Sequence, residues 1–162
     1  AQATLLAVDG AVAADVVSQL RRIPPDATDL VLSAGGNDAL GHVGLLTRRA
    51  QAGGQVLGWF ADAVDAFARD YRLVVEALAG LGRRVVLCTI YDGNLHEDER
   101  RPARAALAIF NDAIQRVARE HRLPVIELRA VCTEPGDYAN PIEPGVQGGR
   151  KIAAAIVKEL GV

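Results

Sequence analysis

The sequence predicts an α/β fold in which a parallel sheet lies between two layers of helices. Three observations indicate this fold. Apolar runs of strand length alternate with longer segments whose apolar residues recur every three or four positions. Some of the short runs are continuously apolar, as in parallel strands that are buried on both faces. At 162 residues the chain also fits one domain with a sizeable core.

The strands are expected in four apolar runs, at residues 4–8, 29–33, 84–90 and 123–128. The first run ends in Asp9-Gly10, which is a turn signal. The second runs directly into Gly35-Gly36-Asn37-Asp38, a glycine-hinged turn that presents polar side chains. Because ligands bind at the carboxyl ends of the strands in open α/β sheets, we expect the functional site at this turn.

The helices are expected between and after these runs, at residues 12–22, 39–49, 55–79, 102–121 and 146–160. The third carries a long apolar stripe that includes Leu57, Phe60 and Val64. Pro102 fits the first turn of the fourth helix. A loop at residues 130–145, rich in Pro, Gly and acidic residues, is long enough to suggest a functional role.

Composition and charge exclude several classes of function. A formal net charge of −2 gives no electrostatic basis for binding nucleic acid or an anionic membrane. The sequence has neither an apolar run of membrane-helix length nor a signal peptide, so we expect a cytoplasmic protein. Cys88 and Cys132 are expected to be reduced thiols. No cofactor or metal is expected, because His96-Glu97-Asp98-Glu99 is typical of a solvated charge run.

Separated segments of the chain together resemble the SGNH (GDSL-type) hydrolases, which are flavodoxin-like three-layer α/β/α esterases and lipases. Gly35-Gly36-Asn37-Asp38 resembles the G-x-N-D turn of that family. Asp9-Gly10 stands where the family has its oxyanion-hole glycine. Residues 140–144, Asn-Pro-Ile-Glu-Pro, stand where the family has D-x-x-H-P before its last helix. Phe110-Asn111 is also similar, and the resemblance in order and spacing extends over essentially the whole chain.

The resemblance implies an ester (acyl) hydrolase that acts on a small-molecule acyl ester through a serine nucleophile. Gly10 and Asn37 would form the oxyanion hole. Glu143 would stand at the proton-transfer position, and Asn140 at the position of the residue that orients it. Four further residues are expected in the substrate cleft: Gly36, Asp38, His42 and Tyr91.

This sequence departs from the family pattern at two places. The G-D-S segment has no counterpart, because the serines are Ser18, within an expected helix, and Ser33, at a strand end. Glu143 and Asn140 replace the family's His and Asp. We therefore expect residues 1–162 to form a single, N-terminally incomplete domain that lacks the nucleophile strand. The chain alone is expected to be inactive, and its open sheet position could pair with the missing strand or with another chain.

Other interpretations of these residues remain open. The domain could be a non-catalytic binding or interaction module that kept the fold and lost the triad. A small-molecule or phosphate-binding flavodoxin-like domain is opposed by the absence of G-x-G-x-x-G and P-loop motifs. Asn37-Asp38 could act only as a helix cap. His42 could be a substitute base or simply a packed side chain.

Overall fold

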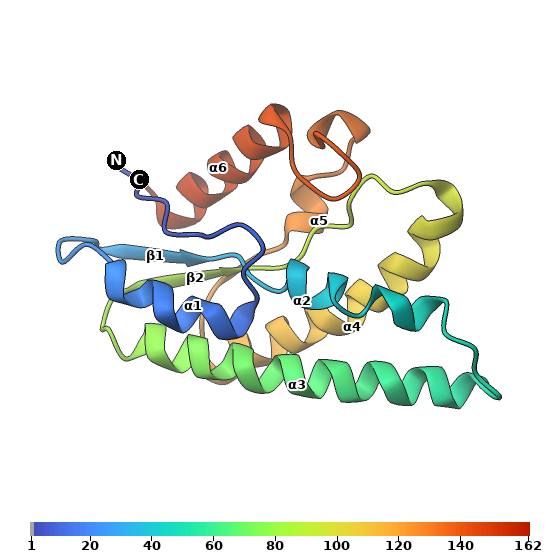
Figure 1. Ribbon diagram of the computed structural model, residues 1–162. Helices are drawn as coiled ribbons and strands as arrows, with labels where there is room; N and C mark the ends of the chain where they lie inside the picture. The colour runs from blue at the N-terminus through green and yellow to red at the C-terminus, as the bar shows by residue number, and fades with distance from the viewer. Residues whose placement is uncertain (1) are drawn as a thin grey trace.

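The structure, a computed structural model, describes residues 2–162 and confirms the predicted α/β fold with a parallel sheet (Figure 1). Within these residues the sheet has three strands in the order β1-β2-β3. They are β1 (Asp29–Leu32), β2 (Arg84–Cys88) and β3 (Val125–Ile126). β1 pairs in parallel with β2 over its whole length, and β2 pairs with β3 through only two residues.

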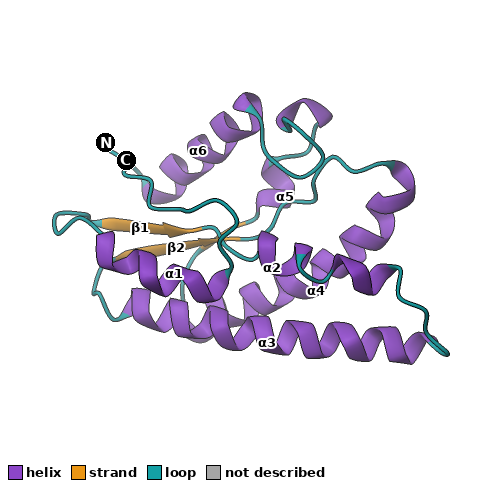
Figure 2. Ribbon diagram, in the orientation of Figure 1, coloured by secondary structure: helices purple, strands orange, loops and turns teal. Residues whose placement is uncertain are grey.

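Helices cover both faces of this sheet (Figure 2). One face carries α1 (Ala13–Gln19), α3 (Gly53–Ala79) and α4 (Glu97–His121). The other carries α5 (Leu128–Val131) and α6 (Val146–Leu160). The short α2 (Gly36–Leu40) follows β1 at its carboxyl end, and 3-10 turns occupy η1 (Leu20–Arg22), η2 (Val43–Leu46) and η3 (Pro135–Asp137).

The strands divide the core into two clusters because alternate side chains point to opposite faces. Leu30, Leu32, Val85 and Leu87 pack with α1, α3 and α4. Val86, Cys88 and Ile126 pack with Ile152, Ile156 and other residues of α6. Val31 has the alternate orientation in β1 and is 38% exposed. The second face of β1 is therefore incompletely covered.

The prediction of a strand at residues 4–8 is wrong, because this segment pairs with none of the described strands. Leu5 is 87% exposed and Val8 is 53% exposed. A side chain of η1 contacts the segment, through a hydrogen bond from the Arg22 guanidinium to the Leu6 carbonyl oxygen. Apolar composition alone does not make a strand when no neighbouring strand accepts its backbone hydrogen bonds.

Other predicted boundaries also moved. α4 begins at Glu97, so Pro102 lies inside the helix and not in its first turn, where three acidic residues suit the helix dipole. The predicted fourth strand is reduced to β3, because Leu128 begins α5. Leu57 is 65% exposed, since the beginning of α3 extends beyond the sheet (Figure 1). Only α6 has the predicted bounds.

In the described part of the chain, none of the helices combines the length and the apolar character that crossing a bilayer requires. Cys88 and Cys132 are both free, as predicted, and both are buried. Burial raises the pKa of the Cys88 thiol to about 12, so this thiol is unreactive near neutral pH.

Candidate active site

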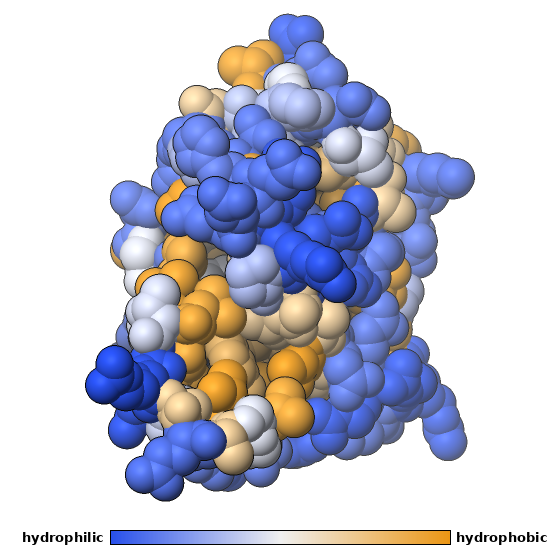
Figure 3. Space-filling view, turned by 90° about the vertical axis from the view of Figure 1, so that its right-hand side faces the viewer, coloured by the Kyte–Doolittle hydropathy of each residue, from blue (hydrophilic) through white to orange (hydrophobic). Residues whose placement is uncertain are grey.

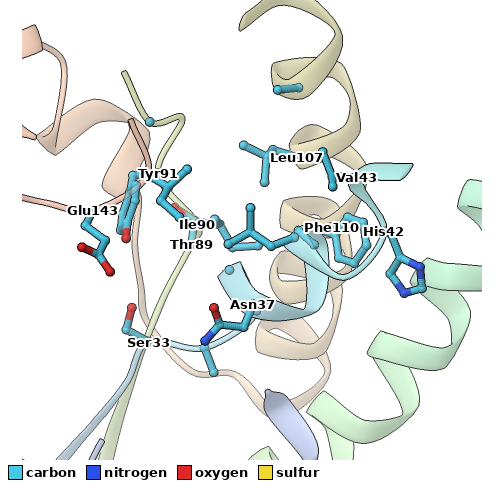
Figure 4. Close-up of a pocket in the computed structure, with 18 of the residues that line it drawn as sticks. Ser33, Asn37, His42, Val43, Thr89, Ile90, Tyr91, Leu107, Phe110 and Glu143 are labelled. Carbon is cyan, nitrogen blue, oxygen red and sulfur yellow. The ribbon is translucent and has the colours of Figure 1, made fainter. Parts of the chain in front are cut away.

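A cavity of about 360 Å³ opens at the carboxyl ends of β1 and β2. Figure 4 shows Ser33, Asn37, Tyr91 and Glu143 toward one end of it, with His42, Val43, Leu107 and Phe110 toward the other. The first end is polar and is bounded by the loops that follow β1 and β2. The second lies between η2, α3 and α4 and is mostly apolar. The cavity therefore lies at the carboxyl-end edge of the sheet, where the functional site was expected.

Asn37 reaches the cavity because the chain turns sharply after β1. Gly35 adopts a φ of +116°, which favours glycine. A Cβ there would lie 3.0 Å from the Phe67 ring and 3.2 Å from Ile90 Cδ1, so the turn also passes close to the core. The Asn37 amide then donates a 2.9 Å hydrogen bond to the Ala11 carbonyl oxygen. This bond fixes the plane of the amide at the cavity wall.

Gly10 and Asp38 do not line the cavity, whereas Gly36 and Asn37 do. The Asp38 carboxylate accepts hydrogen bonds of 3.0 and 3.3 Å from Ala13 N, in the first turn of α1. Burial raises the pKa of Asp38 despite that bond. Gly10 has a φ of +75° in the turn that precedes α1. Asp38 is placed to hold α1 against α2 and not to contact a ligand in the cavity.

The structure brings Asn140 and Glu143 together on the turn before α6. Asn140 Nδ2 donates a 2.6 Å hydrogen bond to Glu143 Oε2. Asn140 Oδ1 accepts bonds of 2.9 Å from the backbone N–H groups of Ile142 and Glu143. Glu143 lines the cavity, and Asn140 supports it from outside. The two positions implied by the family resemblance are thus adjacent and hydrogen-bonded.

An ion pair with a buried carboxylate anchors the turn that carries Glu143. The Asp137 side chain is fully buried, and Lys151 Nζ of α6 lies 2.7 and 2.8 Å from its two oxygens. The Lys151 ammonium holds the pKa of Asp137 below its usual value. The Asp137 carbonyl oxygen accepts a 2.7 Å bond from Gly145 N. It also passes so close to Gly148 that a Cβ there would lie 2.2 Å away.

The loop after β2 contacts the same turn from the other side. Asn94 N donates a 2.8 Å hydrogen bond to the Pro141 carbonyl oxygen. Gly93, at a φ of +77°, passes so near that oxygen that a Cβ would lie 2.7 Å from it. Tyr91 packs edge-on against Tyr138, with ring centroids 5.8 Å apart. Burial raises the pKa of the Tyr91 phenol, and the Glu143 charge adds to this effect.

Asn111 has a structural part in this region that spacing alone does not reveal. Its side chain is buried in α4 and hydrogen-bonds both backbone groups of Ile90, at 2.7 Å to N and 2.9 Å to O. It thereby replaces a strand partner just past the end of β2. In this way the Asn111 amide fixes the backbone of Ile90, and the next residue, Tyr91, extends into the cavity.

Ser33 also lines the cavity, although no site role was predicted for it. Two residues after the partly exposed Val31, it follows the strand alternation toward the open face. His42 lines the apolar half, with its ring 6.2 Å from that of Phe110. Figure 4 shows it at the end of the cavity away from Glu143. No group of three or more metal-ligating side chains occurs among residues 2–162.

Comparisons with known proteins agree with this architecture. The sequence matches the GDSL-like Lipase/Acylhydrolase family over residues 1–148. No curated protein matched the chain in a sequence search. Among solved structures, it is similar to the acetyl xylan esterase AlAXEase, with a TM-score of 0.68 and 16% identity, over 94% of this chain and 78% of that one.

Two further structures have similar folds. One is an extracellular lipase from Streptomyces rimosus, with a TM-score of 0.64 and 19% identity, over 90% of this chain and 77% of the lipase. The other is a GDSL-like lipase from Bacteroides thetaiotaomicron, with a TM-score of 0.67 and 14% identity, over 94% and 72% of the two chains. At these identities the structural matches show the fold, and the family match covers most of the sequence. The chain belongs to the GDSL-like lipase/acylhydrolase family.

Proposed function

We propose that this chain supplies the oxyanion-binding and proton-transfer side of an SGNH-type ester hydrolase. The nucleophilic serine would come from a segment outside residues 1–162. The observation that carries this proposal is that Asn37, after β1, and Glu143, on the turn before α6, line one cavity at the carboxyl ends of β1 and β2. An amide donor and a carboxylate acceptor at this edge are the groups that acyl transfer requires on either side of a reacting carbonyl.

Asn37 would stabilise the oxyanion. Its amide nitrogen carries two hydrogens, and the bond to the Ala11 carbonyl uses one of them. The second N–H is left for the carbonyl oxygen of a substrate, which becomes negative when the serine attacks. Because the amide is neutral and already oriented, it stabilises this charge with little reorganisation. The backbone N–H of Gly10 is proposed as a second donor, because the Asn37–Ala11 hydrogen bond joins its turn to the cavity wall.

Glu143 would transfer the protons. As the serine Oγ bonds to the carbonyl carbon, Glu143 would take the hydroxyl proton and then give it to the departing alcohol oxygen. In the second half, it would take a proton from water as the water oxygen attacks the acyl-enzyme, and return it to the serine. Asn140 would hold the carboxylate in place through the 2.6 Å bond. Asn140 is thus a positioning residue in this proposal.

The open edge of β1 is the proposed place for the serine segment. β1 has a partner on one side only within residues 2–162, and Val31 on its less covered face is 38% exposed. An unpaired edge of this kind offers backbone donors and acceptors to a further strand. A strand added there would end beside Asn37, at the same sheet edge. The strand could belong to the same polypeptide or to another chain.

Hydrolysis of p-nitrophenyl esters tests this proposal. We expect the chain of residues 1–162 to release p-nitrophenol no faster than buffer. The natural gene product that contains this sequence should hydrolyse the ester, and Asn37→Ala in that product should abolish most of the activity. Robust turnover by residues 1–162 alone would contradict the placement of the nucleophile. Absence of turnover by the natural product would contradict the hydrolase function.

The Asn140–Glu143 pair also favours a second candidate, a binding module that kept the fold and lost its chemistry. Here Asn140 donates a hydrogen bond to Glu143 at the positions where the family has Asp and His, and a carboxylate is in general a weaker base than an imidazole near neutral pH. This candidate predicts that the natural product binds esters without turning them over. It also predicts that the double variant Asn140→Asp/Glu143→His gains turnover if the serine is still present.

A further inference from the structure

We propose that the apolar half of the cavity binds the hydrocarbon part of an unbranched acyl chain of roughly six to ten carbons. This inference rests on the proposed function for the orientation of the ester, and it adds the substrate class. It concerns the region between η2, α3 and α4, on the side of the cavity away from Glu143.

The lining of this half is apolar and firmly packed at its base. Phe110 of α4 is 1% exposed and Phe60 of α3 is 6% exposed, so the two rings form a fixed floor. Phe110 also packs on Phe67, with ring centroids 5.4 Å apart. Leu107 and Leu46 form the walls, and Val43, 58% exposed, stands at the mouth. Figure 3 shows apolar side chains gathered in a hollow that hydrophilic residues surround.

Polarity changes along the cavity in the direction that an acyl ester requires. Asn37 and Glu143 lie toward the polar end, and His42 lies at the other (Figure 4). The His42 ring lies beside Phe110 and presents no negative charge to a hydrocarbon chain. A substrate whose carbonyl meets Asn37 therefore has its acyl chain between η2 and α4. A bound sugar in this half would leave its hydroxyl groups without partners.

The size of the cavity sets the length of the chain. A volume of about 360 Å³ holds roughly ten water molecules. A methylene group has about the same volume as a water molecule, so the cavity holds a similar number of methylene groups. Part of this space belongs to the ester group itself. An acetyl group would leave the apolar half unfilled and would gain little from its burial, whereas each buried methylene adds favourable transfer free energy.

Binding of uncharged amides to residues 1–162 tests the inference without any hydrolysis. Octanamide and acetamide would be titrated into the chain and followed by NMR of the side-chain methyl groups. We expect octanamide to bind at least about tenfold more tightly than acetamide. Val43→Trp should weaken octanamide binding by about tenfold, because the indole closes the mouth. Val157→Trp is the matched control, since Val157 is 48% exposed on α6, and it should leave binding within about twofold.

The outcomes separate this inference from the proposed function. Equal affinity for the two amides, or unchanged octanamide binding in Val43→Trp, would overturn the acyl-chain site. Selective octanamide binding that Val43→Trp weakens would support the site, even if the natural gene product hydrolyses no ester. In that case only the hydrolase function fails. If the natural product is active, its kcat/KM should be higher for p-nitrophenyl octanoate than for the acetate, and Val43→Trp should reverse this order.

Discussion

The Asn37 side-chain amide donates a 2.9 Å hydrogen bond to the backbone carbonyl oxygen of Ala11, which joins the turn after β1 to the turn before α1. Asp38, the next residue, accepts a hydrogen bond from Ala13 N and strengthens the same connection. The two turns are far apart in the sequence, and the family resemblance assigns an oxyanion donor to each. Their hydrogen-bonded contact makes Asn37 both a structural and a functional residue in this account.

Asn37→Ala should therefore affect activity far more than stability. In the active natural product, loss of the amide donor should lower kcat by about 100- to 1000-fold. Loss of the Ala11 bond should lower the free energy of unfolding by about 1 kcal/mol. Steady-state kinetics and urea denaturation measure the two effects. The control is Asn94→Ala, at a loop position that does not line the cavity. This variant should have the kcat of the wild type. A variant with normal kcat would refute the oxyanion role.

Glu143→Gln tests proton transfer with almost no change in shape. The glutamine cannot take the serine proton, so kcat should fall by at least about 100-fold in the natural product. Glu159→Gln, on the exposed surface of α6, is the matched control and should have no effect on kcat. Thermal denaturation should give similar midpoints for both variants. Equal kcat values in the two variants would show that Glu143 is a solvated loop residue.

Gly148→Ala should destabilise the turn that carries Glu143. The new Cβ would lie 2.2 Å from the Asp137 carbonyl oxygen, so backbone must shift, at a cost of about 1–3 kcal/mol in the free energy of unfolding. Gly149→Ala is the control in the same helix, because its Cβ would meet nothing within 4 Å. That variant should gain about 0.5–1 kcal/mol from helix propensity. Chemical denaturation measures the stability of both variants. A Gly148→Ala variant as stable as the wild type would contradict this close packing.

The Asp137–Lys151 pair should make stability depend on acid pH. The pKa of Asp137 is lowered in the folded state, so the unfolded chain binds more protons as the pH falls. The stabilisation is complete above the unfolded pKa, about 3.9, and is lost as the pH falls through the folded pKa. Lys151→Met should lower the free energy of unfolding by about 1–3 kcal/mol near neutral pH.

The difference between the wild type and Lys151→Met should then shrink as the pH is lowered from about 6 to about 2, because Asp137 becomes protonated in both proteins. Lys158→Met, near the end of α6, is the control and should show no such pH-dependent difference. Urea denaturation at a series of pH values measures this. A difference that stayed constant with pH would mean that Lys151 acts through packing alone.

Much of the fold was predictable because its signals are local. The stripe on α3 and the bounds of α6 follow from helical periodicity, and the continuous apolar run of β2 follows from burial on both faces. The failed strand at residues 4–8 is different in kind. Its sequence has strand character, but a strand also needs a neighbour, and pairing is a property of the whole sheet. The early start of α4 shows the acidic first turn outweighing Pro102 as a boundary signal.

The site was only partly predictable for the same reason. Asn37 could be placed from its position after a buried strand, since strand ends gather at one edge. Asp38 could not, because its contact with Ala13 depends on where α1 packs. The apolar half of the cavity depends on how η2 sits against α4, so Val43 and Leu107 carried no functional signal in the sequence. Ser33 could have been found from strand alternation with Val31.

Labelling with a fluorophosphonate probe, read by intact mass and peptide mapping, tests the central claim most directly. The account predicts one adduct on the natural gene product, at a serine outside residues 1–162, and none on the chain of residues 1–162 alone. Asn37→Ala in the natural product should slow the labelling while leaving its site unchanged. An adduct on Ser33 or Ser18 of the isolated chain, or no adduct on the natural product, would contradict the account.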